Sequence, residues 1–320
     1  MYKVSVITTI FKTERFLSKC LNSLLAQSLP EIEFVWVDNG ASDECKQIIQ
    51  NYKEDNIKVV RLNSNQGYVG GIKAGLKVAT GEYIGFCDSD DWLDPTYYEQ
   101  LYSLIVKNNA DVAICPYTIE NTDGSSKKED LNFYGVTSDV FSLFKSISCG
   151  SIWNCLFKRN LLSVDFIDEK NKKSIFMDNL FLISALINSK KAVLTNAVSY
   201  HYFQRDDSTI RHMSRMTVLN ASKYIVSSLE PLFFEKNDLK TLYAVVNFLQ
   251  RSIPIYLIDK NYLSNSLIFK QFCEKTYFNK YIYKFYFPSF KDRLFSLSIN
   301  NEKSRIKLRM LGITKTFKVC

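Results

Sequence analysis

Three carboxylates stand within four residues of the chain, in the segment FCDSDDW (residues 86–92). They follow a short apolar run and precede Pro95, which is typical of the start of a helix. Asp88 and Asp90 alternate, so an extended segment places both on one side, where their repulsion favours a bound cation. Such oxygen ligands suit a Mg²⁺ or Mn²⁺ ion that also takes diphosphate oxygens. The alternative is a solvated turn in which Asp91 or Asp94 caps a helix.

A second polar cluster, VDNGASD (residues 37–43), closes another apolar run. The Asp38 carboxylate can accept a hydrogen bond from an imide N–H such as that of uracil, and Gly40 lets the backbone turn closely beneath a ring. The alternative is an ordinary turn followed by a helix cap at Ser42. A third cluster begins at Asn65, where glycines at 67, 70, 71 and 75 permit close backbone approach.

An alternation of strands and helices must position these clusters. Apolar runs of strand length occupy residues 4–10, 32–37, 57–62 and 83–87. Helical patterns follow at residues 14–28, after Ser42 and around residues 70–79. This alternation predicts a parallel α/β sheet. Ligands of such sheets bind beyond the carboxyl ends of the strands, which is where the polar clusters lie.

Composition limits the classes of site. The 320 residues can bury a full core, and the eight cysteines include no CxxC pair, so we expect reduced thiols. Two histidines, His201 and His212, are too few for a His-rich zinc or haem site, and any metal should have mainly oxygen ligands. The first residues lack the stages of a signal peptide, and no run approaches the roughly 18 apolar residues of a membrane span. A cytoplasmic protein is predicted.

Changes in composition predict the domains. The turn-rich segment NTDGSSKKED (residues 121–130) divides a domain over residues 1–212 into a donor half, 1–120, and an acceptor half, 121–212. Helical periodicity from about residue 214 predicts a helical, basic C-terminal region over residues 213–320. From Lys260 onward 13 Lys and Arg stand against three acidic residues, a surplus of 10, which leaves 8 − 10, or −2, for the rest.

The basic tail, residues 260–320, interleaves aromatics with lysines in YFNKYIYKFYF (residues 277–287), and four basic residues follow between 303 and 309. This composition suits the headgroup layer of an anionic membrane, so peripheral binding at the inner face of the cytoplasmic membrane is predicted. The alternatives are a helical subdomain with solvated lysines and a homodimer contact. No recognition motif for nucleic acid accompanies the charge, so no nucleic-acid partner is expected.

The motifs together resemble the family-2 glycosyltransferases over residues 4–95. The resemblance is carried, in order, by VSVITTIFKTERFLSKCLNSLLAQ, VWVDNGASD and NQGYVGGIKAGLKVATGEYIGFCDSDDWLDP. It implies a GT-A fold, which is a Rossmann-like, mainly parallel sheet flanked by helices, here with the helical C-terminal region. It also implies an inverting transfer of sugar from a nucleotide donor.

The resemblance implies a set of donor-binding residues. Thr9, Phe11 and Glu14 would line a uridine pocket near the end of the first strand. Asp38 would contact the base, and Asn65 would lie near the base and ribose. Asp88 and Asp90, after the fourth strand, would form the DxD metal site. The donor-binding residues so implied are Thr9, Phe11, Glu14, Asp38, Asn65, Lys73, Asp88, Ser89, Asp90 and Arg205.

Two departures concern this donor half. The family commonly carries a second aspartate where this chain has Asn39, and an Arg-Asn pair where it has Ile72 and Lys73. The first change leaves the identity of the base open. The second removes a guanidinium, whose charge Lys73 is expected to replace.

Three later segments resemble the acceptor half of capsule and lipopolysaccharide members. SIWNCLFKR (residues 151–159) is similar to a W-x-K-L-[YF]-[KR]-R segment, and Trp153 is predicted, with Asp91, to contact the acceptor, unless Trp153 is simply core. FMDNLF (residues 176–181) stands where the family has an acidic pair, so the resemblance makes Asp178 the catalytic base. The alternative for Asp178 is a helix N-cap.

The segment YHYFQRDDST (residues 200–209) resembles a Y-x-x-R-x-x-S segment that closes over the diphosphate, with Arg205 as a bidentate phosphate ligand. His201 or His212 could add a metal or phosphate contact, although a lone histidine is more often structural.

These residues predict an inverting hexosyltransferase. It would move a sugar from a UDP-sugar to a hydroxyl of a bacterial surface glycan, lipopolysaccharide or capsule, with Mn²⁺ or Mg²⁺ as cofactor. The departures at Asn39, Ile72 and Met177, which replaces a glutamate, leave open a catalytically impaired glycan-binding or scaffold protein. A sugar nucleotidyltransferase would need a Gly-rich, Arg-containing phosphate loop after the first strand, and TTIFK (residues 8–12) is not one.

Overall fold

The computed structural model describes residues 2–147, 150–163 and 176–205, isolated helical positions between 221 and 248, and three strands between 295 and 318. The chain divides into two units, Met1–Leu257 and Ile258–Cys320. The boundary predicted after residue 212 falls outside the described residues and stays a prediction. None of the helices described here is long and apolar enough to cross a membrane.

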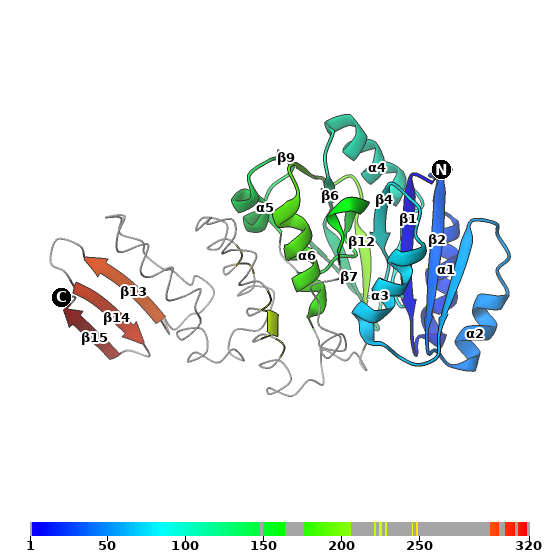
Figure 1. Cartoon of the computed structure of the whole chain (residues 1–320), viewed down its shortest axis with the longest axis horizontal. Coiled ribbons are helices and arrows are strands. Elements are labelled where there is room, and N and C mark those ends of the chain that lie inside the picture. Colours follow the sequence, from blue (N-terminus) through cyan, green and yellow to red (C-terminus); the bar gives the residue numbers. More distant parts are fainter. Residues whose placement is uncertain are drawn as a thin grey trace. The chain divides into compact units, whose positions relative to one another are not determined.

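The first unit is built on an eight-stranded sheet with the strand order β3-β2-β1-β4-β10-β6-β11-β9 (Figure 1). Four neighbouring strands, β3 to β4 in that order, are parallel, and β10 runs antiparallel between β4 and β6. The mainly parallel α/β sheet predicted from the sequence is therefore confirmed. Its strands are β1 (Val4–Ile10), β2 (Ile32–Asn39), β3 (Ile57–Leu62), β4 (Tyr83–Phe86), β6 (Val112–Ile114), β9 (Gly135–Thr137), β10 (Cys155–Lys158) and β11 (Ala192–Leu194).

A smaller sheet has the order β5-β12-β7-β8. Its strands are β5 (Trp92–Leu93), β7 (Tyr117–Asn121), β8 (Ser126–Glu129) and β12 (Tyr200–Gln204). β12 pairs with β5 on one side and with β7 on the other, so residues far apart in the sequence become neighbours. The turn-rich segment 121–130 contains a turn followed by the edge strand β8, whose lysines suit an exposed sheet edge.

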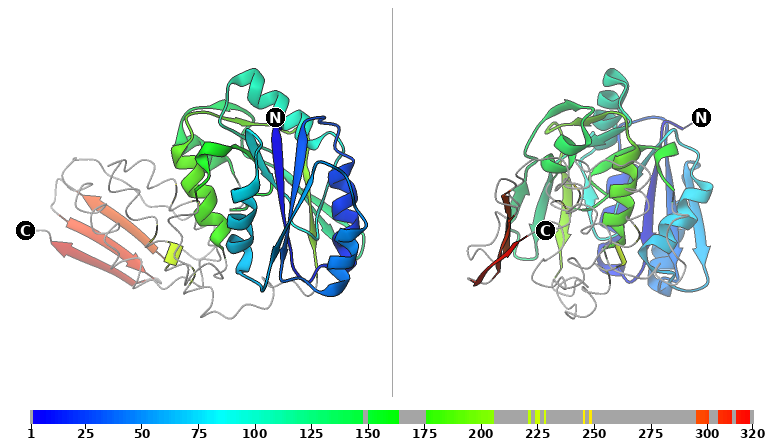
Figure 2. Two further views of the ribbon diagram at one scale, coloured as in Figure 1. Left: turned by 45° about the vertical axis from the view of Figure 1, so that its right-hand side comes forward. Right: turned by 60° about the vertical axis from the view of Figure 1, so that its left-hand side comes forward.

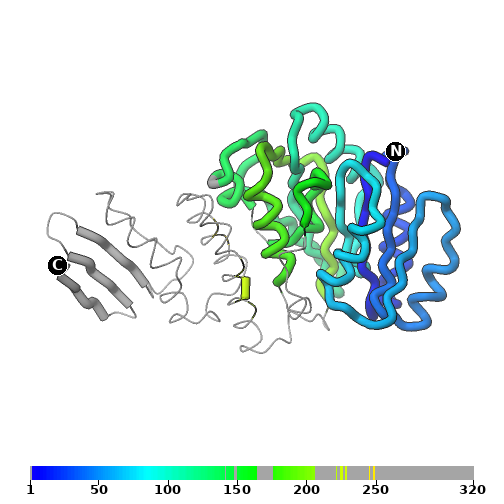
Figure 3. Tube along the Cα trace, in the orientation of Figure 1, coloured from blue at the N-terminus to red at the C-terminus, as the bar shows by residue number. Residues whose placement is uncertain are grey.

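Helices cover both faces of the main sheet, as the left view of Figure 2 shows, and Figure 3 follows the same winding as a trace. Phe86 packs on Phe181 of α6, with ring centroids 5.8 Å apart, whereas a Cβ on the adjacent Gly85 would meet Tyr98 of α4. Successive strand residues face opposite ways, so α6 and α4 lie on opposite faces. The helices are α1 (Glu14–Leu25), α2 (Asp43–Gln50), α3 (Gly67–Val78), α4 (Tyr97–Asn108), α5 (Val140–Ser146), α6 (Met177–Asn188) and the 3₁₀ helix η1 (Arg159–Leu161).

The glycines of α3 bring this helix onto the sheet. A Cβ on Gly71 would overlap the side chain of Thr9, and one on Gly75 would lie 2.6 Å from Cγ2 of Ile7. The close backbone approach predicted from the glycine spacing is thus at least in part an approach of helix to strand. It holds the N-terminal end of α3 beside the end of β1.

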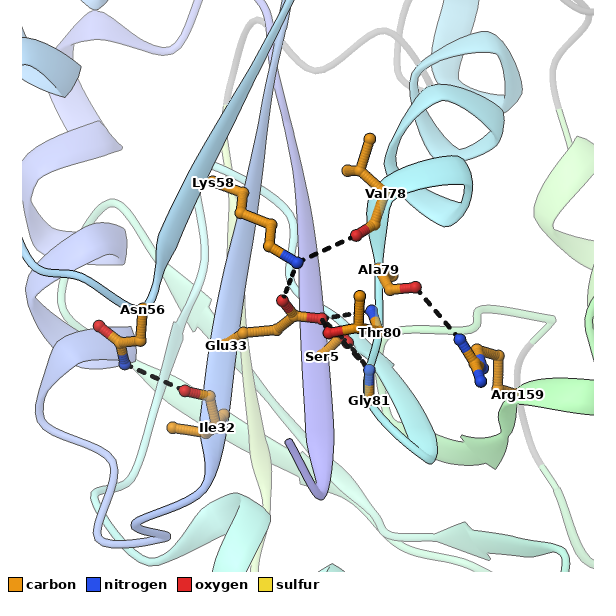
Figure 4. Close-up of polar contacts among 10 residues, drawn as sticks. All are labelled: Ser5, Ile32, Glu33, Asn56, Lys58, Val78, Ala79, Thr80, Gly81 and Arg159. Carbon is orange, nitrogen blue, oxygen red and sulfur yellow. Dashed lines mark hydrogen bonds and ion pairs between the residues drawn. The ribbon is translucent and has the colours of Figure 1, made fainter. Parts of the chain in front are cut away.

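A buried carboxylate joins the strands at the opposite, amino-terminal edge of the parallel strands (Figure 4). Glu33 on β2 is fully buried, and its Oε2 pairs with Nζ of Lys58 at 2.6 Å. Its Oε1 accepts hydrogen bonds from Ser5 Oγ, Thr80 Oγ1 at 2.9 Å and the backbone N–H of Thr80 and Gly81. Burial acts to raise the pKa of Glu33, but the hydrogen bonds outweigh it and hold the pKa below its usual value.

We expect Glu33→Gln to lower the free energy of unfolding by about 1–3 kcal/mol, because the amide cannot replace all the charge-assisted hydrogen bonds. The folded-state pKa is lowered, so this stabilisation is present above the unfolded-state pKa of about 4.3 and is lost as pH falls through the folded value. Urea unfolding should show the two proteins converging below about pH 4. The control is Glu31→Gln, which removes an exposed pair with Lys3 and should change little. Equal losses in both variants would contradict the assignment.

The second unit contains a three-stranded antiparallel sheet of β13 (Phe295–Asn300), β14 (Arg305–Met310) and β15 (Ile313–Lys318). The prediction of a helical region over residues 213–320 is therefore wrong for these strands. Apolar residues alternate in FSLSIN and RIKLRM with a period of two, which is the pattern of a strand. Residues 260–294 of the basic tail lie outside the described part.

Candidate functional site

The predicted site residues follow strands whose carboxyl ends lie side by side. β1 pairs with β2 up to Ile10 and Asp38, and with β4 up to Ile7 and Phe86. The loops after these strands touch: Thr13 Oγ1 donates a hydrogen bond to Ser89 Oγ at 2.9 Å, and both side chains are buried. The sequence prediction of one site at this edge therefore has a structural basis in the strand register.

The loop after β4 holds two carboxylates that disfavour each other's charge. Burial, and next the carboxylate of Asp90, raise the pKa of Asp88 to about 7. A hydrogen bond from the Tyr68 hydroxyl and the Arg205 guanidinium act in the opposite direction, and Asp178 adds to the rise. An ionised pair of this kind would be stabilised by a cation.

The residues present fit a divalent ion that is shared with a substrate. Among the described residues, no group of three or more His, Cys, Asp or Glu side chains is arranged to hold a metal by itself. Asp88 and Asp90 could supply hard oxygen ligands and would leave the other positions to water or to diphosphate oxygens. Mg²⁺ in phosphate-transferring sites is commonly bound in this way.

Asp91 ties the loop after β4 to the second sheet. Its Oδ2 accepts a hydrogen bond from the Tyr200 hydroxyl and its Oδ1 one from the Phe203 N–H, both at 2.7 Å. The Tyr200 hydroxyl in turn accepts a hydrogen bond from the Asp88 N–H at 3.0 Å. Since Asp91 is 1% exposed and both its oxygens are engaged, the expected acceptor contact of Asp91 is not supported. The residue holds β12 against the loop after β4, which carries the predicted metal ligands Asp88 and Asp90.

Arg205 follows β12 and reaches the same loop. Its Nε lies 3.0 Å from Oδ2 of Asp90, and its guanidinium carbon lies 5.6 Å from the ring centroid of Phe16 on α1. Phe203 packs on the same Phe16 ring with centroids 5.2 Å apart. The predicted phosphate ligand is therefore placed beside the predicted metal ligand.

Asp178 lies in the first turn of α6 and is near enough to Asp88 to raise its pKa. The N-cap residue of α6 is Phe176, so Asp178 is not the N-cap that the alternative interpretation required. Burial raises the pKa of Asp178 to about 6, although hydrogen bonds from the N–H and the side chain of Asn179 oppose the rise. A carboxyl group with such a pKa can exchange a proton near neutral pH.

Comparison with known proteins shows the family of this chain. Residues 5–166, half of the chain, match the model of glycosyl transferase family 2. The chain belongs to this family. The family-2 match covers β1 to β10, and so includes the metal-site loop but neither Asp178 nor Arg205.

Three relatives place this family-2 chain among glycosyltransferases. The putative glycosyltransferase EpsH of Bacillus subtilis is 29% identical over 208 residues, 62% of this chain and 60% of EpsH. The cholesterol galactosyltransferase of Borreliella burgdorferi is 27% identical over 301 residues, 86% of this chain and 81% of that protein. TarS of Staphylococcus aureus, a poly(ribitol-phosphate) β-N-acetylglucosaminyltransferase, is 27% identical over 233 residues, 72% of this chain and 40% of TarS. The chain thus spans less than two thirds of EpsH and of TarS.

The fold has a solved counterpart. The crystal structure of TarS residues 1–349 in complex with UDP-GlcNAc superimposes with a TM-score of 0.59 at 18% identity, and covers 98% of this chain and 99% of that one. This likeness confirms the GT-A type of fold expected from the sequence.

The departure of this family-2 chain at Asn39 has a structural role. Asn39 Nδ2 donates to the Gly67 carbonyl and Oδ1 accepts from the Gln66 N–H, both at 2.9 Å, while Asn65 Oδ1 accepts from the Gly67 N–H at 2.7 Å. The Asn39 side chain therefore holds the loop that precedes α3 through two hydrogen bonds. Asp38 beside it is 1% exposed, and its Oδ1 accepts from the Ala41 N–H at 2.8 Å, as in the turn offered as the alternative to a base contact.

The remaining predicted donor residues line the same edge. Glu14 begins α1 and accepts a hydrogen bond from Ser42, which lowers the pKa of Glu14 and joins the loops after β1 and β2. Thr9, Phe11 and Lys73 are half-buried. Ile72, where the family commonly has arginine, is 1% exposed, so an apolar residue suits this position here.

Trp153 is mostly core. It is 8% exposed, stacks on Tyr200 with centroids 4.3 Å apart and on Tyr202 at 5.7 Å, and meets Tyr117 edge-on at 5.1 Å. The interpretation of Trp153 as core therefore describes it better than an acceptor contact. Its ring supports Tyr200, whose hydroxyl holds the metal-site loop.

His201 also has a structural place. Its Nδ1 lies 2.8 Å from Glu120 Oε1 and its Nε2 3.3 Å from Asp94 Oδ1, and its ring stacks on Trp92 with centroids 5.5 Å apart. These contacts join β12 to β5 and β7, and the expected metal or phosphate contact is not among them. His212 and residues 206–209 lie outside the described part of the chain.

Two tyrosines of the site were missed in the sequence. Tyr68 precedes the glycine pair of α3 and has no motif signal, yet its hydroxyl reaches Asp88. Tyr200 opens the segment that carries Arg205, so its position in that motif was the available signal.

We expect Asn39→Asp to lower the free energy of unfolding by about 1–3 kcal/mol, because a carboxylate cannot donate to the Gly67 carbonyl and would place a charged oxygen against it. The control Asn63→Asp adds the same charge at an exposed position of the same loop and should change stability by about 0.5 kcal/mol at most. Urea unfolding of the two variants measures the difference. Equal stabilities would show that the hydrogen bonds of Asn39 are unimportant.

Proposed function

We propose that this glycosyltransferase moves a sugar from a UDP-sugar to a hydroxyl of a bacterial cell-surface polymer by a metal-dependent, inverting displacement. The observation that carries the proposal is the convergence of three elements on one loop: the Asp88–Asp90 pair after β4, Arg205 after β12 and Asp178 on α6. The similarity to TarS, which was crystallised with UDP-GlcNAc and is named for its transfer to poly(ribitol-phosphate), supports the donor and the acceptor class.

Charge separation is the main demand of this reaction. The bond between the anomeric carbon and the diphosphate oxygen breaks, and its electron pair leaves with UDP. Asp88 and Asp90 would hold Mn²⁺ or Mg²⁺, which supplies positive charge to the diphosphate when bound. Arg205, already at this loop, would donate hydrogen bonds to the same oxygens. Stabilisation of the leaving group in this way is the largest contribution that we assign to the protein.

The incoming hydroxyl must lose its proton as its oxygen bonds to the anomeric carbon. Asp178 would accept this proton, because its carboxylate lies close enough to influence Asp88 and its pKa is about 6. Attack and departure in one in-line step would invert the anomeric centre. Asn179, which donates to Asp178 Oδ1 at 3.0 Å through its N–H, would keep the carboxylate oriented.

The place of the reaction is also a proposal. The surplus of basic residues from Lys260 onward would bring the enzyme to the anionic inner face of the cytoplasmic membrane, and there to a lipid-linked glycan acceptor. A homodimer contact through the same residues is the alternative, and binding to anionic vesicles against self-association distinguishes the two.

The decisive assay is release of UDP from a panel of UDP-sugars, with and without Mn²⁺. We expect metal-dependent release with one sugar, and a loss of at least about 100-fold in Asp90→Asn, because the metal site is broken. Asp178→Asn should lose transfer to an acceptor by a similar factor while it still binds UDP with Mn²⁺. If no UDP-sugar binds by calorimetry, the proposal fails and a glycan-binding scaffold becomes the better description.

The pH profile tests the role of Asp178 separately. Its raised pKa means that the basic form is populated above about pH 6, so kcat/KM for transfer should fall about tenfold per pH unit below that value and level off above it. The residual activity of Asp178→Asn should lack this acid limb. An unchanged limb in the variant would assign the titration to another group and remove Asp178 as the base.

A further inference from the structure

The cation beside the metal-site loop in this structure is a side chain. Nε of Arg205 lies 3.0 Å from Oδ2 of Asp90, at the position where a ligand oxygen would face an ion. Resting on the function proposed above, we infer that Arg205 is the internal counter-ion of the DxD loop, which a divalent ion must displace before the donor binds. Arg205 would thereby set the metal affinity of the donor-free enzyme.

The backbone places Arg205 there independently of any ligand. Asp91 holds β12 through the Tyr200 hydroxyl and the Phe203 N–H, and Phe203 is two residues before Arg205. β12 is further paired with β5 through Tyr200–Leu93 and His201–Trp92. The guanidinium then lies near the Phe16 ring, at 5.6 Å, an arrangement that favours a cation over an aromatic face. Arg205 is thus preorganised against Asp90.

The contact has the properties of an exchangeable pair. Although Nε is 3.0 Å from Oδ2, this N–H lacks the alignment of a hydrogen bond, so the attraction through Nε is mainly coulombic. The side chains of Arg205 and Asp90 keep 18% and 20% of their surface exposed, which lets water and ions reach them. A pair that keeps some contact with water costs less to separate than a fully buried one.

Charge balance favours the exchange. Asp88 and Asp90 carry two negative charges when both are ionised, and one guanidinium neutralises half of them. A divalent ion neutralises both charges and binds oxygen atoms of both carboxylates. A guanidinium carries a single positive charge and can only donate hydrogen bonds to these oxygens. Displaced from Asp90, Arg205 would remain near Phe16 and available to the incoming diphosphate.

The test is Mn²⁺ binding to the full-length protein without nucleotide, followed by the electron paramagnetic resonance signal of free Mn²⁺. We expect Arg205→Gln to bind Mn²⁺ about threefold to tenfold more tightly than the wild type, because the competing charge is gone. Arg205→Lys, which keeps the charge, should stay near the wild-type value. Asp90→Asn should abolish the binding, which identifies the site.

The matched control is Arg15→Gln. Arg15 lies over the same Phe16 ring, with its guanidinium carbon at 5.7 Å, but is exposed and makes no described contact with Asp90. It removes the same charge from the protein, so its Mn²⁺ affinity should equal that of the wild type. Equal or weaker Mn²⁺ binding in Arg205→Gln, or an equal gain in Arg15→Gln, would overturn the inference. Circular dichroism confirms that each variant is folded.

A second titration separates this inference from the proposed function. With Mn²⁺ saturating, UDP should bind Arg205→Gln more weakly than the wild type. The variant should therefore have a higher affinity for Mn²⁺ and a lower affinity for UDP. If the wild type binds Mn²⁺ but no UDP, the proposed function fails, and the Mn²⁺ titration still decides the role of Arg205. If UDP binds normally and Arg205→Gln leaves Mn²⁺ affinity unchanged, the function stands and the inference fails.

Discussion

The buried carboxylate of Asp91 is the interaction on which the site depends. It joins β12 to the loop after β4 across more than 100 residues of sequence, and it does so with two hydrogen bonds of 2.7 Å. Burial and the neighbouring Asp90 and Asp88 raise the pKa of Asp91, so its charged form is disfavoured. A typical hydrogen bond contributes about 0.5–1.5 kcal/mol net, and a buried group left unpaired costs about 1–3 kcal/mol, so the two bonds still form a strong local constraint. Because Tyr200 also accepts from the Asp88 N–H, the same junction fixes the backbone of a predicted metal ligand and the strand that leads to Arg205.

Stability and chemistry are assigned to opposite edges of one sheet. At the amino-terminal edge, the charge of Glu33 is paired with Lys58, its carboxylate accepts hydrogen bonds from the loop before β4, and its pKa is lowered. At the carboxyl edge, Asp88 shares its surroundings with Asp90, and its pKa is raised. The first arrangement stabilises the folded chain on its own. The second is favourable only in part until a cation is present, which is the expected property of a binding site.

The sequence predicted most of the donor half because its signals are local. The alternation of strands and helices, and the loops that follow β1, β2 and β4, are encoded by periodicity and by turn residues near one another in the chain. Asp91 and Trp153 were predicted to contact the acceptor, but both are buried against β12. This strand begins at residue 200, and nothing in the sequence near residue 91 or residue 153 indicates that contact. Tyr68 was missed because its neighbour Asp88 follows a different strand and the local sequence carries no sign of that contact. The strands β13 to β15 were overlooked because the helical pattern before them was extended to the end of the chain, although their own residues alternate with a period of two.

The two roles proposed for aspartates of this site need different environments, and the aspartates concerned lie on different elements, the loop after β4 and α6. A metal ligand must be ionised when its cation is bound. The pKa of Asp88 is raised to about 7 by burial and by Asp90, and a bound divalent ion would lower it, in the same direction as Arg205 and the Tyr68 hydroxyl already act. A base must release its proton afterwards, which requires a pKa near the working pH and no permanent counter-ion. Asp178 meets this condition, since burial raises its pKa to about 6 and the groups that lower it are the hydrogen bonds of Asn179 and the local backbone instead of a cation. A carboxylate on α6 placed as near to Arg205 as Asp90 is would be held ionised and would be a weaker base. Asp178 lies in the first turn of α6, and no cation is among the main groups that lower its pKa, which is the environment that the proposed role as base requires.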